Sequence, residues 1–285
     1  LNFMDFIRYD TPPAAIVLVL FLAMLWVGLG PRLKVRKEAR DRVLELDERE
    51  ALRDPVLLRK CLAVFALVLV GFVVHGPLHL EPGTIALAGA ALLLLLIGRT
   101  SPDPDQPDDY HWYHEIEWPT IFFFIGLFIM VSALANLGIL EALGHWVAEL
   151  AGGNMLAMTM ILLWFSGLAV AVVNNVAFVA PMNAILLQLH NEMFPGMDNP
   201  HDPTFMPLWW ALSLGACLGA NLTPIATAAN VVVMNIGERN NHHISFRRFF
   251  KYSIPVVTMS LIVSTIYLWL VFFRYRSTAL MRLTS

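Results

Sequence analysis

Polar side chains interrupt two long apolar runs of the sequence, and they are the residues best suited to chemistry. In the first run, AVVNNVAFVAP, the neighbours Asn174 and Asn175 follow directly after two valines. In the second run, GACLGANLTPIATAAN, the interrupting residues are Gly219, Asn221, Thr223, Pro224, Thr227 and Asn230. Amide and hydroxyl oxygens can coordinate a cation, while amide N–H groups donate to an anion. These residues therefore predict an ion-binding site.

The same positions carry signals that interrupt a helix. Pro224 lacks a backbone donor and clashes one turn back, and the nearby glycines tolerate dihedrals that other residues resist. Asn174 and Asn175 lie near the midpoint of the run from Met155 to Leu189, which is much longer than the roughly 20 residues of one membrane crossing. We therefore expect a re-entrant helical hairpin at 155–189 and a discontinuous helix at 207–237.

An interrupted helix inside a bilayer has a direct physical use. The exposed amides of one half carry partial positive charge, and the exposed carbonyls of the other half carry partial negative charge. Each residue also has a purely structural interpretation, since Asn and Thr often join neighbouring membrane helices, glycine allows close packing and a lone proline often only kinks a helix. The combination of an asparagine pair with a second, Gly-Asn-Thr-Pro break favours a site.

The composition indicates whether the chain is adapted to water or to lipid. Of its 285 residues, 58% are hydrophobic and only 14% are charged, against roughly a quarter charged in soluble proteins. The apolar runs are long enough to cross a hydrocarbon layer about 30 Å thick, and they lack the strict alternation of barrel strands. The sequence therefore predicts an all-α integral membrane protein built as a helical bundle.

Basic residues predict the orientation and the segments of the chain. More than half of the 19 lysines and arginines lie between Arg32 and Lys60, which places that loop in the cytoplasm. The segments that we expect are a helix within 1–30, a cytoplasmic linker at 31–56, a membrane-spanning part at 57–273 and a tail at 274–285.

Other functions are disfavoured by what the apolar runs lack. They contain no serine–histidine pair, paired aspartates or HExxH motif, so we predict no enzyme and no cofactor. Cys61 and Cys217 have no metal-ligand spacing and are interpreted as core thiols. A net charge of -3 provides no basic surface for nucleic acid. The run 207–237 also has no carboxylate, so an acid for proton exchange would have to come from elsewhere.

The segments EWPTIFFFIGLFIMVSALANLGIL, NNVAFVAPM and LWWALSLGACLGANLTPIATAANVVV resemble the second half of an ion transporter superfamily. It contains arsenite permeases, D-type sodium–proton antiporters, and citrate or dicarboxylate carriers. By this resemblance Asn174, Asn175 and Val176 match the tip of the hairpin. The residues that match the unwound helix are Gly219, Asn221, Thr223, Pro224, Thr227 and Asn230.

The resemblance implies secondary active ion transport in the inner membrane of a bacterium, by a pair of inverted repeats. By the same resemblance, 1–30 is the last helix of a first repeat and 57–273 is the second transport repeat. A sodium–proton antiporter is the first expectation. The alternative is a permease for arsenite, another anion or a carboxylate, because Asn174–Asn175 replaces the Asp-Asn that many exchangers of the superfamily carry. An alternative of another class is a membrane scaffold without transport activity that acts through the loop from Arg32 to Lys60.

The resemblance also implies particular partners. These are the lipid bilayer, a small inorganic ion or organic anion, and a first N-terminal repeat upstream of this sequence. A homodimer of chains in opposite orientations would also restore the symmetry, although the basic loop opposes dual insertion. Sodium, the expected coupling ion, would bind at Asn175, Asn221 and Thr223.

Overall fold

The fold consists of helices joined by turns and short connections in the part of the chain that the structure, a computed structural model, describes. The described residues are 3–30, 55–78, 80–97, 118–139, 142, 149, 152–194, 202–242 and 244–274, and no strand occurs among them. The chain divides into two compact units, one formed by residues 1–8 and 22–116 and the other by residues 9–21 and 117–285. The predicted all-α fold class is confirmed.

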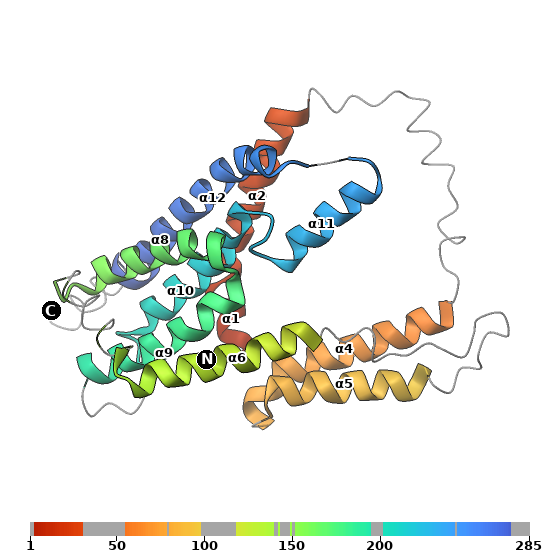
Figure 1. The fold of residues 1–285 in the computed structure, drawn as a ribbon, viewed down its shortest axis with the longest axis horizontal. Coiled ribbons are helices and arrows are strands. Elements are labelled where there is room, and N and C mark those ends of the chain that lie inside the picture. Colours follow the sequence, from red (N-terminus) through yellow and green to blue (C-terminus); the bar gives the residue numbers. More distant parts are fainter. Residues whose placement is uncertain are drawn as a thin grey trace, which may run out of the picture. The chain divides into compact units, whose positions relative to one another are not determined.

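The first unit is built around two packed helices, α4 (Pro55–Leu78) and α5 (Pro82–Ile97), which lie side by side in Figure 1. Glycines let them approach closely. A β-carbon at Gly71 would lie 2.7 Å from the Ile85 side chain, and one at Gly89 would overlap a side chain of α4. Close packing of this kind is how helices associate where lipid surrounds them.

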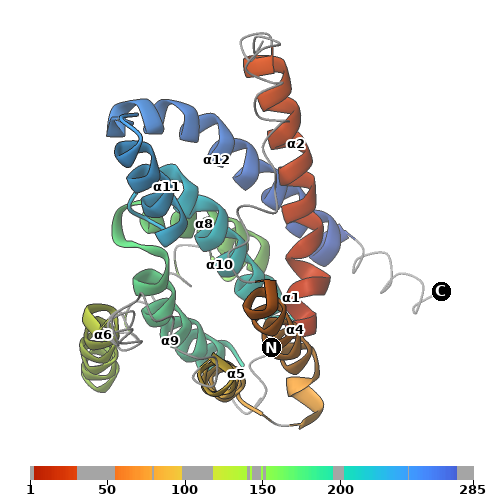
Figure 2. The same cartoon turned by 90° about the vertical axis from the view of Figure 1, so that its right-hand side faces the viewer.

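The second unit contains the helices that carry the predicted site. They are the first half of α2 (Thr11–Leu29), α6 (Trp118–Asn136), α8 (Met155–Val173), α9 (Asn175–Met193), α10 (Met206–Gly219), the 3-10 turn η3 (Ala220–Leu222), α11 (Ala228–Arg239), α12 (Phe246–Leu268) and the π-helical turn η4 (Trp269–Arg274). The short helix α1 (Phe3–Tyr9) precedes α2. Among these elements α10 is central, because it packs against α8, α9 and α12 (Figures 1 and 2).

Capping side chains determine where two of these helices begin. Asn154 Oδ1 accepts hydrogen bonds from the amides of Leu156 (2.9 Å) and Ala157 (3.3 Å) at the start of α8. Ser245 Oγ accepts from the Arg248 amide (3.4 Å) at the start of α12. Such caps typically stabilise a helix by about 1 kcal/mol because they satisfy amides that have no partner in the first turn.

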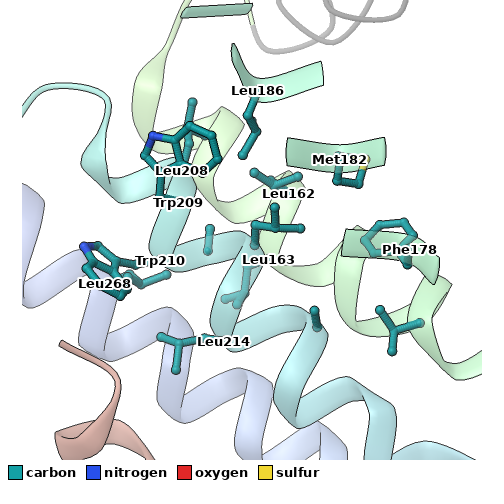
Figure 3. Close-up of a cluster of buried hydrophobic side chains, with 14 of the residues drawn as sticks. Leu162, Leu163, Phe178, Met182, Leu186, Leu208, Trp209, Trp210, Leu214 and Leu268 are labelled. Atoms are coloured by element: carbon teal, nitrogen blue, oxygen red, sulfur yellow. The ribbon is translucent and has the colours of Figure 1, made fainter. Parts of the chain in front are cut away.

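The apolar core of the second unit lies where α8, α9, α10 and α12 meet. Figure 3 shows Leu162 and Leu163 from α8 beside Trp210 and Leu214 from α10, with Phe178 from α9 nearby. Lipid is as apolar as these side chains, so exclusion from water does not hold the helices together. The stabilisation comes from dispersion contacts between interlocking side chains.

Helices α8 and α10 touch through three glycines, Gly167, Gly215 and Gly219, which we call the glycine seam. A β-carbon at Gly215 would lie 2.5 Å from Leu163 O, and one at Gly219 would overlap the backbone of Gly167. The seam therefore allows the two backbones to approach as in a small-xxx-small helix pair.

Four helical stretches of the described chain are long and apolar enough to cross a membrane: Thr11–Gly28, Pro55–Gly76, Met155–Val172 and Phe246–Arg274. Large apolar side chains on these stretches remain exposed, including Val19 (65%) and Val172 (77%). An apolar surface of this extent is adapted to lipid rather than to water. The predicted integral membrane protein is confirmed.

The helices can be compared with the segments expected from sequence. The helix expected at 1–30 is divided into α1 and α2 at Asp10. The hairpin 155–189 coincides with α8 and α9, although α9 continues to Met193, and 207–237 coincides with α10, η3 and α11. Residues 31–54 of the linker and 275–285 of the tail lie outside the described residues. The assignment of these segments to two repeats remains a prediction.

Candidate ion-binding site

Asn174 is the one residue that separates α8 from α9, since α8 ends at Val173 and α9 begins at Asn175. Its φ of 91° is unusual for a residue with a β-carbon, and asparagine tolerates positive φ better than most residues. Its amide donates to Val170 O (3.2 Å) and ends α8. Its Oδ1 accepts from the Val176 amide (3.1 Å) and begins α9. One side chain therefore builds the tip of the hairpin.

The second interruption lies between α10 and α11. After η3 the backbone is extended at Thr223 (φ -125°, ψ 154°) and again at Thr227 (φ -136°, ψ 148°), where α11 begins. Pro224, between them, is buried. The helix is therefore discontinuous across 223–227.

Two hydrogen bonds hold the two interruptions together. The Asn175 amide donates to Ala226 O (3.2 Å), so the first residue of α9 contacts the unwound segment directly. Thr223 Oγ1 donates to Ala171 O (2.7 Å) in the last turn of α8, and this contact is buried. We call these two contacts the tip–break contacts. They bring four helix ends into one small region.

Asn230, in the first turn of α11, forms hydrogen bonds with the unwound segment. Its Nδ2 donates to Thr223 O (3.1 Å) and, at 3.5 Å, to Ala220 O, while its amide donates to Thr227 Oγ1 (3.2 Å). Carbonyls released by the broken helix thus gain a side-chain donor, which lowers the cost of breaking a helix away from water.

The remaining predicted residues occupy different positions around this region. Asn221 is exposed on η3 and donates from Nδ2 to Leu218 O (3.3 Å). Val176 is 51% exposed at the tip, whereas Gly219 is buried in the glycine seam. Of the three residues expected to bind sodium, Asn175 and Thr223 take part in the tip–break contacts. A bound sodium ion at these residues remains a prediction.

Sequence reasoning missed a carboxylate of the second unit. Asp10, between α1 and α2, accepts a hydrogen bond at Oδ2 from Ser213 Oγ of α10 (2.6 Å). Cys217 lies one turn further along α10, with its thiol near Ser213 and Asn175. Cys217 is exposed in the structure and not a core thiol as interpreted. The only sequence signal for Asp10 was an acid directly before the Thr-Pro-Pro that begins an apolar run.

No solved structure matches the chain. The profile of the citrate transporter family matches residues 1–215. The chain belongs to the citrate transporter family.

This member of the citrate transporter family has relatives in bacteria and in mammals. It is 37% identical over 273 residues to an uncharacterized transporter of Mycobacterium tuberculosis, covering 96% of this chain and 60% of that protein. It is 35% identical over 269 residues to a 46 kDa membrane protein of Mycobacterium leprae, covering 94% of this chain and 59% of that protein. It is 34% identical over 234 residues to the human P protein, covering 79% of this chain and 26% of that protein. The chain thus spans about 60% of the length of the mycobacterial relatives.

Family membership confirms the transporter superfamily recognised from the hairpin and the unwound helix. Together with the four candidate spans it confirms an integral membrane protein. The prediction that the chain has no enzymatic activity stays a prediction.

Proposed function

We propose that this chain forms one wall of the ion path in a secondary active transporter, which uses ion gradients and no ATP. The observation that carries the proposal is the contact between the hairpin tip and the unwound segment, Asn175 N to Ala226 O at 3.2 Å. Membrane transporters commonly bind substrates and coupling ions where two discontinuous helices meet. In this proposal the ion binds beside the tip–break contacts.

The helix ends at this region suit an ion of either sign. α9 and α11 begin there and direct partial positive charge toward it, while α8 and α10 end there and direct partial negative charge. A membrane-embedded site has a low dielectric, so such fixed partial charges act more strongly than they would in water. Neutral amide and hydroxyl side chains add contacts without the cost of burying a charge.

The cargo that we favour is a carboxylate anion, with sodium at Asn175, Asn221 and Thr223 as a coupling ion. The description of the family as citrate transporters supports this choice. The asparagine pair at the tip, with no acid of its own, also supports an anion. Sodium–proton exchange is the second candidate, and the half-buried contact of Asp10 with Ser213 favours it.

The proposal includes a second wall for the ion path, supplied by a first repeat. Two inverted repeats build the binding sites of many secondary transporters. A homodimer is the alternative source of that wall.

The test is transport by the full-length protein in sealed lipid vesicles. We expect uptake of radiolabelled citrate driven by an imposed sodium or proton gradient. Sodium-driven proton movement without any need for an anion would instead select the second candidate. Absence of both activities in vesicles that hold folded protein would refute the proposed function.

A matched pair of variants tests the location of the site. Asn175→Leu removes a polar side chain at the tip–break contacts, and we expect it to lower uptake about tenfold or more. Asn183→Leu is the control, because Asn183 lies on the same helix, is exposed and takes no part in the tip–break contacts. Equal uptake by both variants would exclude the hairpin tip as part of the site.

A further inference from the structure

Asp10 is a titratable group that the tip–break contacts do not use. Its Oδ2 accepts from Ser213 Oγ at 2.6 Å, a distance typical of a hydroxyl that donates to an ionised carboxylate. Its Oδ1 is enclosed and has no hydrogen-bond partner among the residues that the structure describes. One oxygen of the carboxylate is thus held by a hydrogen bond, and the other is buried without one.

In the described part of the chain, the side chains that interact with Asp10 carry no positive charge. Ser213 and Cys217 face it from α10, Tyr267 interacts with it from α12, and Tyr9 precedes it in α1. The basic side chain of the neighbouring turn η4, Arg274, lies over the Trp269 ring, 5.7 Å from its centroid. An enclosed carboxylate is expensive to keep ionised without a counter-charge. A proton on Oδ1 would neutralise it.

A chain of polar side chains joins Asp10 to the hairpin tip. Ser213 donates to Asp10, and the thiol of Cys217 lies near the side chains of Ser213 and Asn175. Because residues four apart on a helix lie on one face, Ser213 and Cys217 form a single stripe along α10. A change in the charge of Asp10 therefore has a short route to the tip–break contacts.

We propose that Asp10 is the coupling-proton site of the transporter, and that Ser213 and Cys217 connect it to Asn175. The proton binds at Oδ1 when the carboxylate becomes neutral, and it leaves from the same oxygen toward the opposite side of the membrane. No covalent bond other than O–H forms or breaks. The inference rests on the proposed function and adds to it the residue that carries the proton.

The first experiment uses Asp10→Asn in the full-length protein, in vesicles loaded with a pH-sensitive dye. We expect proton movement during citrate or sodium transport to fall about tenfold or more. Exchange of labelled for unlabelled citrate, which needs no net proton movement, should continue. Asp5→Asn is the control, because Asp5 belongs to the other compact unit. Proton movement equal to the wild-type rate in Asp10→Asn would overturn the inference.

If Asp10→Asn does not fold, a second variant tests whether Asp10 carries the proton. Ser213→Ala removes the hydroxyl that favours the ionised carboxylate, so proton binding should begin at higher pH. We expect the pH profile of transport to shift upward by about 1 unit. An unchanged profile would overturn the proton role of Asp10 while leaving transport intact. Failure of the wild-type protein to transport citrate or sodium would overturn the proposed function, and this inference with it.

Discussion

At the scale of single residues, Asn174 shows how one side chain builds a functional turn. Its φ of 91° lies in a region that residues with a β-carbon rarely adopt. Its Oδ1 also caps α9 at the Val176 amide. The sequence predicted a turn here because two adjacent amides lie near the midpoint of an apolar run that is too long for one membrane crossing. It did not reveal which of the two adopts the unusual backbone, since that depends on the path of the chain.

Substitutions at Asn174 should separate its two roles. Asn174→Gly keeps the positive φ without strain and should cost only a few tenths of a kcal/mol for the lost cap. Asn174→Val loses the cap and strains the backbone, so we expect a loss of roughly 1–3 kcal/mol. The measurement is thermal unfolding of the detergent-solubilised protein. Equal stability of the two variants would show that the backbone at 174 is not strained.

At the scale of helices, the glycine seam explains why α8 and α10 lie closer than side chains would allow. Gly219 was predicted as a site residue because it belongs to the stretch that matches the unwound helix of the superfamily. The structure adds a packing role, since its α-carbon faces the backbone of Gly167. A pattern of small residues signals both uses equally, so sequence alone could not assign this one.

Gly219→Ala tests the seam. The added methyl group would meet the backbone of Gly167, which cannot rotate away, so we expect a destabilisation of about 1–3 kcal/mol. Gly126→Ala in α6 is a suitable control, since a β-carbon there meets nothing within 4 Å. Thermal unfolding in detergent compares the two. A Gly219→Ala protein as stable as the control would contradict the packing role.

At the scale of the whole molecule, the features that could be predicted from the sequence were the local ones. The hairpin and the unwound helix were expected because hydrocarbon penalises polar residues wherever they occur. The pairing of Asp10 with Ser213 was not, because the two residues lie 203 positions apart. Contacts of that separation depend on how helices assemble, and apolar runs that are hydrophobic on all sides do not indicate which faces meet.

Accessibility of the two cysteines tests the predicted ion path. Cys217 is exposed and lies near the hairpin tip, whereas Cys61 lies in the apolar helix α4. A membrane-impermeant maleimide should modify Cys217, and transported citrate should slow that reaction several-fold. Cys61, measured in a Cys217→Ser protein, should not react. A Cys217 that stays unreactive under every condition would argue against water reaching the tip.

The glycine seam has a mechanical consequence. Helices usually slide past one another on a layer of side chains that changes rotamers. α8 and α10 have no such layer where Gly167 faces Gly219, so they are poorly able to slip. Alternating access would then require α8 and α10 to move together as one rigid body, which carries the hairpin tip and the unwound segment at its end.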